Sequence, residues 1–165
     1  MKKYEFTGET KEIRLLFRTA TLHRIRATVA FGIVEVGDLG GWIEKEENLS
    51  HEGKAWVWGN AKVWGNAKVC GDAKVCGDAE VFSASHVLVI GAIGSRNDFT
   101  TFYRDKNNEI TVKCGCFLGK IDRFLEKVTQ THGDSKYALV YRAAVEVAKL
   151  QIDLSGEAPK DADEE

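Results

Sequence analysis

A six-residue repeat constrains this chain more than any other feature of its sequence. Four consecutive units, VWGNAK, VWGNAK, VCGDAK and VCGDAE, occupy residues 57–80, and weaker units extend the pattern over residues 51–92. Alanine and the following valine lie two residues apart, so they point to the same side of an extended segment. The Gly-Asn or Gly-Asp pair tolerates positive φ and supplies a turn. The repeat therefore predicts short strands joined by corners, with valine and alanine facing inward.

The aliphatic residue, the two corner residues and the small inward residue of each unit resemble the hexapeptide-repeat left-handed parallel β-helix family. In that family three units form one triangular coil, and subunits usually assemble as trimers. The resemblance implies a mainly β, α+β fold class in which a short left-handed parallel β-helix is flanked by other elements. So few units form only a short solenoid, which needs covers at its ends.

Changes in composition divide the chain into five segments. Residues 105–108 (DKNN) read as a hairpin turn between two β-like stretches, and apolar residues at helical spacing follow, interrupted at Gly133. The predicted segments are an N-terminal β region (1–50), the repeat (51–96), a β-hairpin (97–118), a two-helix segment (119–152) and a disordered acidic tail (153–165). The second helix has so few polar positions that we expect most of its surface to be buried, either on the repeat or against the same helix of a neighbouring subunit.

The position after each valine departs from the family pattern, in which it is small or acidic. Here it is apolar and predicted to point outward, at Trp58, Trp64, Cys70, Cys76, Phe82 and Leu88. An exposed apolar ridge of this size implies a cover, formed by the flanking segments or by a sister subunit. The alternative is an aromatic platform for a planar ligand.

Charge and composition exclude several classes of protein. The chain carries 23 Lys and Arg against 25 Asp and Glu, which argues against a protein that wraps DNA. No run approaches the roughly 20 apolar residues that span a bilayer, and the N-terminus does not read as a signal peptide. We therefore expect a cytoplasmic protein with four free thiols, no cofactor, no membrane partner and no nucleic-acid partner.

Opposite charges are concentrated in two neighbouring stretches. Residues 11–34 have a net charge of +4 and residues 35–52 a net charge of −5. We expect these stretches to pair within the fold or across a subunit contact. The alternative is that the basic stretch faces an anionic partner.

Two sets of residues suggest chemistry. His86 is the weak candidate for a catalytic base, because many hexapeptide-repeat proteins are acyltransferases that use a histidine. The repeat has no inserted loop to build an acceptor pocket, so we expect no catalysis.

Cys114 and Cys116, with His132 or the repeat cysteines, are weak candidates for a metal site, but one intervening residue is tighter than zinc pairs prefer. We predict no metal and place these thiols in a core face.

A small anionic ligand is the most concrete binding hypothesis. Arginine suits phosphate because its guanidinium donates two hydrogen bonds at once, and an aromatic ring can stack on a base. The candidate residues follow the repeat and are Arg96, Asn97, Thr100, Thr101, Tyr103, Arg104 and Lys113. The alternative is a hairpin with ordinary surface charge.

Several segments outside the repeat extend the resemblance. The strings at 40–50, 94–98, 114–117 and 131–137 are similar to a group of phage and prophage hexapeptide-repeat proteins, over most of residues 20–150. Small accessory phage proteins often counter host immunity. The likeness thus implies a non-catalytic homo-oligomer, expected to be a trimer, that sequesters a phosphate-bearing molecule such as a nucleotide immune signal in the host cytoplasm. The alternatives are an inhibitor that binds a host immune protein through the Trp/Cys ridge or the acidic stretch, and an acyltransferase that uses His86.

Overall fold

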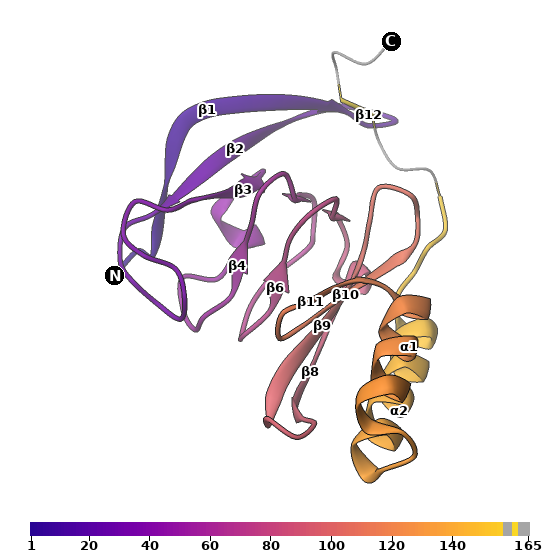
Figure 1. Ribbon diagram of the computed structural model, residues 1–165. Helices are drawn as coiled ribbons and strands as arrows, with labels where there is room; N and C mark the ends of the chain where they lie inside the picture. The colour runs from indigo at the N-terminus through magenta and orange to yellow at the C-terminus, as the bar shows by residue number, and fades with distance from the viewer. Residues whose placement is uncertain (157–159, 162–165) are drawn as a thin grey trace.

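The described chain forms a series of long and short strands, then two helices, then a last short strand (Figure 1). The structure, a computed structural model, describes residues 1–156 and 160–161. The strands are β1 (Tyr4–Arg14), β2 (Thr19–Ala27), β3 (Leu39–Ile43), β4 (Trp56–Val57), β5 (Lys62–Val63), β6 (Lys74–Val75), β7 (Glu80–Val81), β8 (Val87–Ile93), β9 (Asp98–Arg104), β10 (Ile110–Cys114), β11 (Phe117–Lys120) and β12 (Lys160–Asp161). The helices are α1 (Ile121–His132) and α2 (Lys136–Gln151), with short 3₁₀ turns at Glu46–Asn48 and Ala84–His86.

The described strands form three sheets. A six-stranded sheet has the order β12-β1-β2-β3-β5-β7, a four-stranded sheet has the order β11-β10-β9-β8, and β4 pairs with β6. The four-stranded sheet is antiparallel throughout. The six-stranded sheet is mixed, because β3, β5 and β7 pair in parallel while the strands before them pair antiparallel.

The predicted left-handed parallel β-helix is therefore wrong as a fold class. The finding that overturns it is a mixed α+β arrangement of several sheets with two C-terminal helices. The physical reason lies in the repeat strands, which are only two residues long. Two of them, β5 and β7, continue the sheet begun by the long hairpin β1–β2, and Val69 makes only an isolated bridge to Leu49.

Within this arrangement the repeat still governs local packing. The valines at 57, 63, 69, 75 and 81 and the alanines at 55, 61, 67, 73 and 79 are all buried, as predicted for inward positions. The five repeat glycines, at 53, 59, 65, 71 and 77, have φ between 59° and 70°, a region that favours glycine. Parallel partners within the repeat lie 18 residues apart, as Val57 with Val75 and Val63 with Val81.

The apolar ridge is largely covered by the chain itself. Trp64 is buried and stacks on Phe82 with ring centroids 4.7 Å apart. Both belong to a cluster with Trp42 and with residues of the β1–β2 hairpin, including Ile13 and Leu22. Of the six ridge positions only Cys70 is exposed. The flanking segments thus provide much of the predicted cover.

Strand β9 lies between two larger cores. Tyr103 belongs to the core formed by the repeat, whereas its neighbour Phe102 belongs to the core that β9 and β10 form with α1 and α2. The helices lie side by side next to the four-stranded sheet (Figure 1). No helix of the described chain is long and apolar enough to cross a membrane.

The acidic tail predicted to be disordered, 153–165, falls partly outside the described residues. Within them, the Asp153 amide donates to the Ser85 carbonyl at 3.0 Å, and the Gly156 carbonyl accepts from Arg104 at 3.1 Å. Further on, β12 pairs with the end of β1.

Candidate functional site

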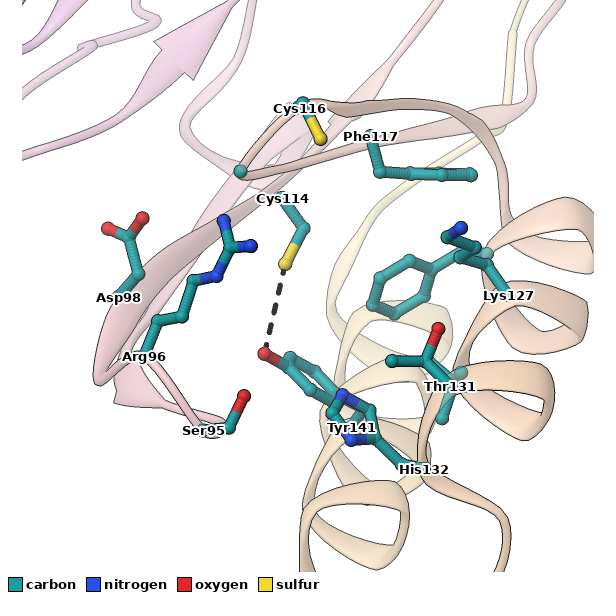
Figure 2. A pocket seen from close by; sticks show the side chains of 13 residues that line it. Ser95, Arg96, Asp98, Cys114, Cys116, Phe117, Lys127, Thr131, His132 and Tyr141 are labelled. Atoms are coloured by element: carbon teal, nitrogen blue, oxygen red, sulfur yellow. Dashed lines mark hydrogen bonds between the residues drawn. The ribbon is translucent and has the colours of Figure 1, made fainter.

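A pocket of about 190 Å³ opens where the four-stranded sheet meets the helices (Figure 2). Its walls come from the β8–β9 loop, the β10–β11 turn, α1 and one residue of α2. The lining residues are Ser95, Arg96, Asp98, Cys114, Gly115, Cys116, Phe117, Phe124, Lys127, Val128, Thr131, His132 and Tyr141. The pocket thus joins segments that are distant in sequence.

Two tight connections shape the pocket. Between β10 and β11 the turn consists of Gly115 and Cys116, and Gly115 has a φ of 56°. Between β8 and β9, Gly94 has a φ of 81°, and a Cβ atom at this position would overlap the Tyr141 hydroxyl. Glycine at position 94 therefore allows Tyr141 to reach the loop that carries Arg96.

Tyr141 points its hydroxyl into the pocket. The residue is only 8% exposed, and within the described chain the one hydrogen bond of its hydroxyl is accepted from the Cys114 thiol at 4.0 Å (Figure 2). Burial, together with Cys114, raises the pKa of Tyr141 to about 12, so the phenol stays protonated near neutral pH. His132 stacks on its ring with centroids 5.8 Å apart. The hydroxyl is thus a fixed donor without a strong acceptor.

Two cations and one carboxylate line the pocket around this hydroxyl. Arg96 lies on the loop and Lys127 on α1, and both are exposed. Within residues 1–156 and 160–161 the Arg96 guanidinium makes no hydrogen bond and no ion pair. Asp98 is the one carboxylate among the lining residues, and after burial and Cys114 its charge also raises the pKa of Tyr141, which the Arg96 charge opposes. The arrangement presents donors and cations to the cavity.

The structure brings only some of the predicted ligand residues together. Arg96 lines the pocket, and Asn97 follows it in the same loop with a φ of 47°. Lys113 lies next to the turn and donates to the Gly115 carbonyl at 2.7 Å. Thr100 is buried and donates to the Cys114 sulfur at 3.4 Å. These residues gather around one end of the four-stranded sheet.

The other three predicted residues lie elsewhere in buried contacts of their own. Thr101 accepts from the Lys74 amide at 3.0 Å, and Tyr103 donates to the Cys76 carbonyl at 2.8 Å. Arg104 is fully buried, lies over the Phe82 ring, and donates to Asn108 and Gly156. Their polar atoms are occupied within the protein, so they do not contribute to the pocket.

His86, the candidate base, is also buried. It is 3% exposed, its Nδ1 accepts from the Phe82 amide at 3.1 Å, and its Nε2 lies 3.3 Å from Arg104. Burial, reinforced by the Arg104 charge, lowers the pKa of His86 to about 4. The imidazole holds a neutral structural position and does not line the pocket described above.

The cysteines predicted as weak metal ligands both line the pocket. All four cysteines of the chain are free thiols. Across the described residues, no group of three His, Cys, Asp or Glu side chains is placed to hold a metal ion. Cys114 is half-buried and Cys116 exposed, so one thiol lies deep in the pocket and the other at its rim.

Sequence reasoning missed the helical half of the site. Phe124 and Val128 read as core residues of α1, which they also are. Lys127 and Thr131, one turn apart on α1, read as an ordinary polar face. No local signal marks them, because only the packing of α1 against the sheet turns them toward Arg96.

No protein-family model matches the chain, and a search of curated proteins gives no match either.

Proposed function

We propose that this protein binds a small phosphate-bearing molecule in the pocket and retains it without converting it. One observation carries the proposal: the Arg96 guanidinium has no partner within the described chain and lies at the same cavity as the buried Tyr141 hydroxyl. Buried polar groups are normally hydrogen-bonded, so a nearly buried donor with only a thiol neighbour suits a ligand acceptor.

The chemistry of the lining residues favours phosphate. Arginine donates two parallel hydrogen bonds to phosphate oxygens, and the Lys127 ammonium adds a second positive charge. The half-buried ring of Phe117 offers an apolar surface for a planar group such as a base. At about 190 Å³ the cavity is smaller than the ~300 Å³ typical of drug-sized sites. We therefore expect one part of a nucleotide to enter and the rest to stay at the rim.

Binding without turnover is supported by what the lining residues do. A nucleophile normally needs a base within hydrogen-bond reach. Among the described residues no hydrogen bond joins His132 to either pocket thiol, and His132 instead stacks on Tyr141. The likeness to phage proteins suggests a role: a phage-encoded protein with such a pocket would withdraw a nucleotide immune signal in the host cytoplasm.

Calorimetric titration tests the proposal. The purified chain is titrated with a panel of cyclic dinucleotides, mononucleotides, ADP-ribose and inorganic phosphate, and we expect at least one nucleotide to bind. Arg96→Ala should weaken that binding about tenfold or more, because a hydrogen bond to a charged group contributes roughly 1.5–3 kcal/mol. Arg123→Ala, which removes an exposed arginine of α1 outside the pocket, is the matched control and should leave the affinity unchanged.

Two outcomes would overturn the proposal. One is that no phosphate compound of the panel binds, and the other is that Arg96→Ala and Arg123→Ala bind alike. Chromatography of the nucleotide after incubation distinguishes retention from catalysis, and recovery of unchanged nucleotide is expected.

A further inference from the structure

The pocket is apolar where it is buried and charged where it is exposed. Its buried lining residues, which we call the floor, are Phe124, Val128 and Tyr141. The cations Arg96 and Lys127 belong to its exposed rim, Arg96 on the β8–β9 loop and Lys127 on α1 (Figure 2). A ligand that enters the pocket therefore leaves its charged part at the rim and brings an uncharged part to the floor.

A phosphate group does not suit the floor. Removing an anion from water costs free energy unless charges or several hydrogen bonds replace its hydration. The floor residues offer one hydroxyl and no cation, and the carboxylate of Asp98 also lines the pocket. A nucleobase is neutral and planar, so it can pack against the rings of Phe117 and Phe124. The floor thus favours a base, and the rim favours a phosphate.

A short series of hydrogen bonds determines what the floor offers to a base. The Thr100 hydroxyl donates to the Cys114 sulfur at 3.4 Å, and the Cys114 thiol donates to the Tyr141 oxygen at 4.0 Å. The Tyr141 hydroxyl hydrogen has no acceptor within the part of the chain that the structure describes. Because buried donors are normally hydrogen-bonded, a ligand acceptor should occupy this position.

The place of the phosphate decides which edge of the base reaches Tyr141. In a nucleotide the phosphate is attached to the ribose, so a phosphate at the rim directs the opposite edge of the base to the floor. In uracil and hypoxanthine that edge carries a carbonyl oxygen, which accepts a hydrogen bond from Tyr141. In cytosine and adenine it carries an amino group, which would face a hydroxyl that already accepts from Cys114. A buried amino group without a free acceptor weakens binding.

We infer that the pocket selects nucleotides whose base carries a carbonyl opposite the ribose, with the base at the floor and the phosphate at the rim. Tyr141 is then the specificity-determining donor, and Arg96 and Lys127 hold the phosphate. This inference rests on the proposed function, because it specifies which nucleotides the same pocket binds and in which direction. A cavity of about 190 Å³ is too small for a whole nucleotide, which agrees with entry of the base alone.

Calorimetric titration with matched nucleotides tests the selectivity. Uridine and cytidine monophosphate differ at the edge in question, as do inosine and adenosine monophosphate, and ribose phosphate lacks a base. We expect the uridine and inosine compounds to bind about tenfold more tightly than their amino counterparts and than ribose phosphate. Tyr141→Phe should abolish the preference within each pair. Tyr137→Phe, which removes a hydroxyl from the same helix outside the pocket, should preserve it.

Saturation-transfer NMR of uridine monophosphate with the unaltered chain tests the direction without a substitution. The ring protons of the base should receive more saturation than the ribose protons next to the phosphate. Equal affinities within each pair, equal affinity for ribose phosphate, or stronger saturation next to the phosphate would overturn this inference. The proposed function survives these outcomes if Arg96→Ala still weakens binding, whereas failure of every phosphate compound to bind overturns both.

Discussion

Buried polar side chains on and just after β9 form hydrogen bonds to the neighbouring segments of the chain. Tyr103 is fully buried and donates to the Cys76 carbonyl of the repeat at 2.8 Å. Asp105, which follows the strand, accepts from Thr111 at 2.7 Å and also from Lys120. Burial alone would raise the pKa of Asp105, but these hydrogen bonds outweigh it and lower the pKa. Each contact fixes a neighbouring segment against β9.

The Tyr103 hydroxyl provides a direct test. Tyr103→Phe keeps the ring but leaves the buried Cys76 carbonyl without this donor, so we expect a loss of about 1–2 kcal/mol in the free energy of unfolding. Urea denaturation should show a lower midpoint with an unchanged slope. Tyr137→Phe removes a hydroxyl from an exposed ring and should have no measurable effect. Equal midpoints for the two variants would contradict this role.

His86 makes the stability depend on pH. Burial, with the Arg104 charge, lowers its pKa from 6.5 to about 4, while the nearby Asp153 opposes the shift. Between these values the unfolded chain binds the proton and the folded chain does not, so the free energy of unfolding falls as the pH decreases from 6.5 toward 4. The part due to His86 is at most about 3 kcal/mol.

A variant without the imidazole isolates this contribution. His86→Asn keeps an acceptor for the Phe82 amide but cannot titrate in this range. Urea midpoints at several pH values between 6.5 and 4 should decrease less steeply for the variant than for the wild type. Parallel pH profiles for both proteins would contradict the assignment.

At the scale of elements, the repeat glycines share one backbone conformation but differ in how closely other atoms approach them. Gly59 and Gly65 both have a φ of 59°. A Cβ atom on Gly59 would meet nothing within 4 Å, whereas one on Gly65 would lie 2.8 Å from the Phe82 carbonyl oxygen. Gly59→Ala should cost about 1–2 kcal/mol from the backbone alone. Gly65→Ala should cost a further 1–3 kcal/mol, roughly, because the packed neighbour must move.

Chemical denaturation of the two alanine variants measures the difference. If Gly65→Ala is no less stable than Gly59→Ala, the close approach of the Phe82 carbonyl, three repeat units further along the chain, is not what requires glycine at position 65.

The sequence predicts elements whose signals are local. The six-residue period identifies the buried valines and alanines, the turn residues at 105–108 identify the β9–β10 hairpin, and the apolar spacing identifies both helices. Residues 39–43 (LGGWI) form β3 although they contain two adjacent glycines. Its glycines are packing positions, since a Cβ on Gly40 would lie 2.6 Å from Ile25. Strand β5 joins the six-stranded sheet by pairing with β3, and β7 joins it by pairing with β5, which no local pattern encodes.

The sequence identifies part of the site by residue type alone. Arg96, Cys114 and Cys116 are sequence candidates that do line the pocket, although their pattern suggests the thiols only as metal ligands. Thr101, Tyr103 and Arg104 are candidates by residue type, as a hydroxyl for hydrogen bonds, a ring for stacking and a guanidinium for phosphate. Strand β9 instead has a core on each side, with Phe102 in one and Tyr103 in the other. The polar groups of these three residues are therefore buried and form hydrogen bonds within the protein.

For the whole molecule, the contribution of strand β9 to two cores predicts cooperative unfolding. All four tryptophans, at 42, 56, 58 and 64, lie in the N-terminal half, whereas both helices lie in the C-terminal half. Tryptophan fluorescence and helical circular dichroism therefore report on different cores. Because β9 contributes to both, we expect the two signals to change together in urea.

A substitution in one core tests this coupling. Val145 is fully buried among α1, α2 and the sheet, and Val145→Ala should cost about 2 kcal/mol. Its fluorescence midpoint should shift as much as its circular dichroism midpoint, although no tryptophan belongs to that core. A shift confined to circular dichroism would show that the two cores unfold independently.

The register of the repeat limits how the gene for such a protein can change in length. Paired residues within the repeat lie 18 residues apart, and both members of a pair occupy the same position of the six-residue unit. Gain or loss of a single unit keeps the frame of valine, glycine and alanine but gives every later strand a different neighbour. Only a duplication or deletion of 18 residues preserves both, so viable length variants should differ by three units at a time.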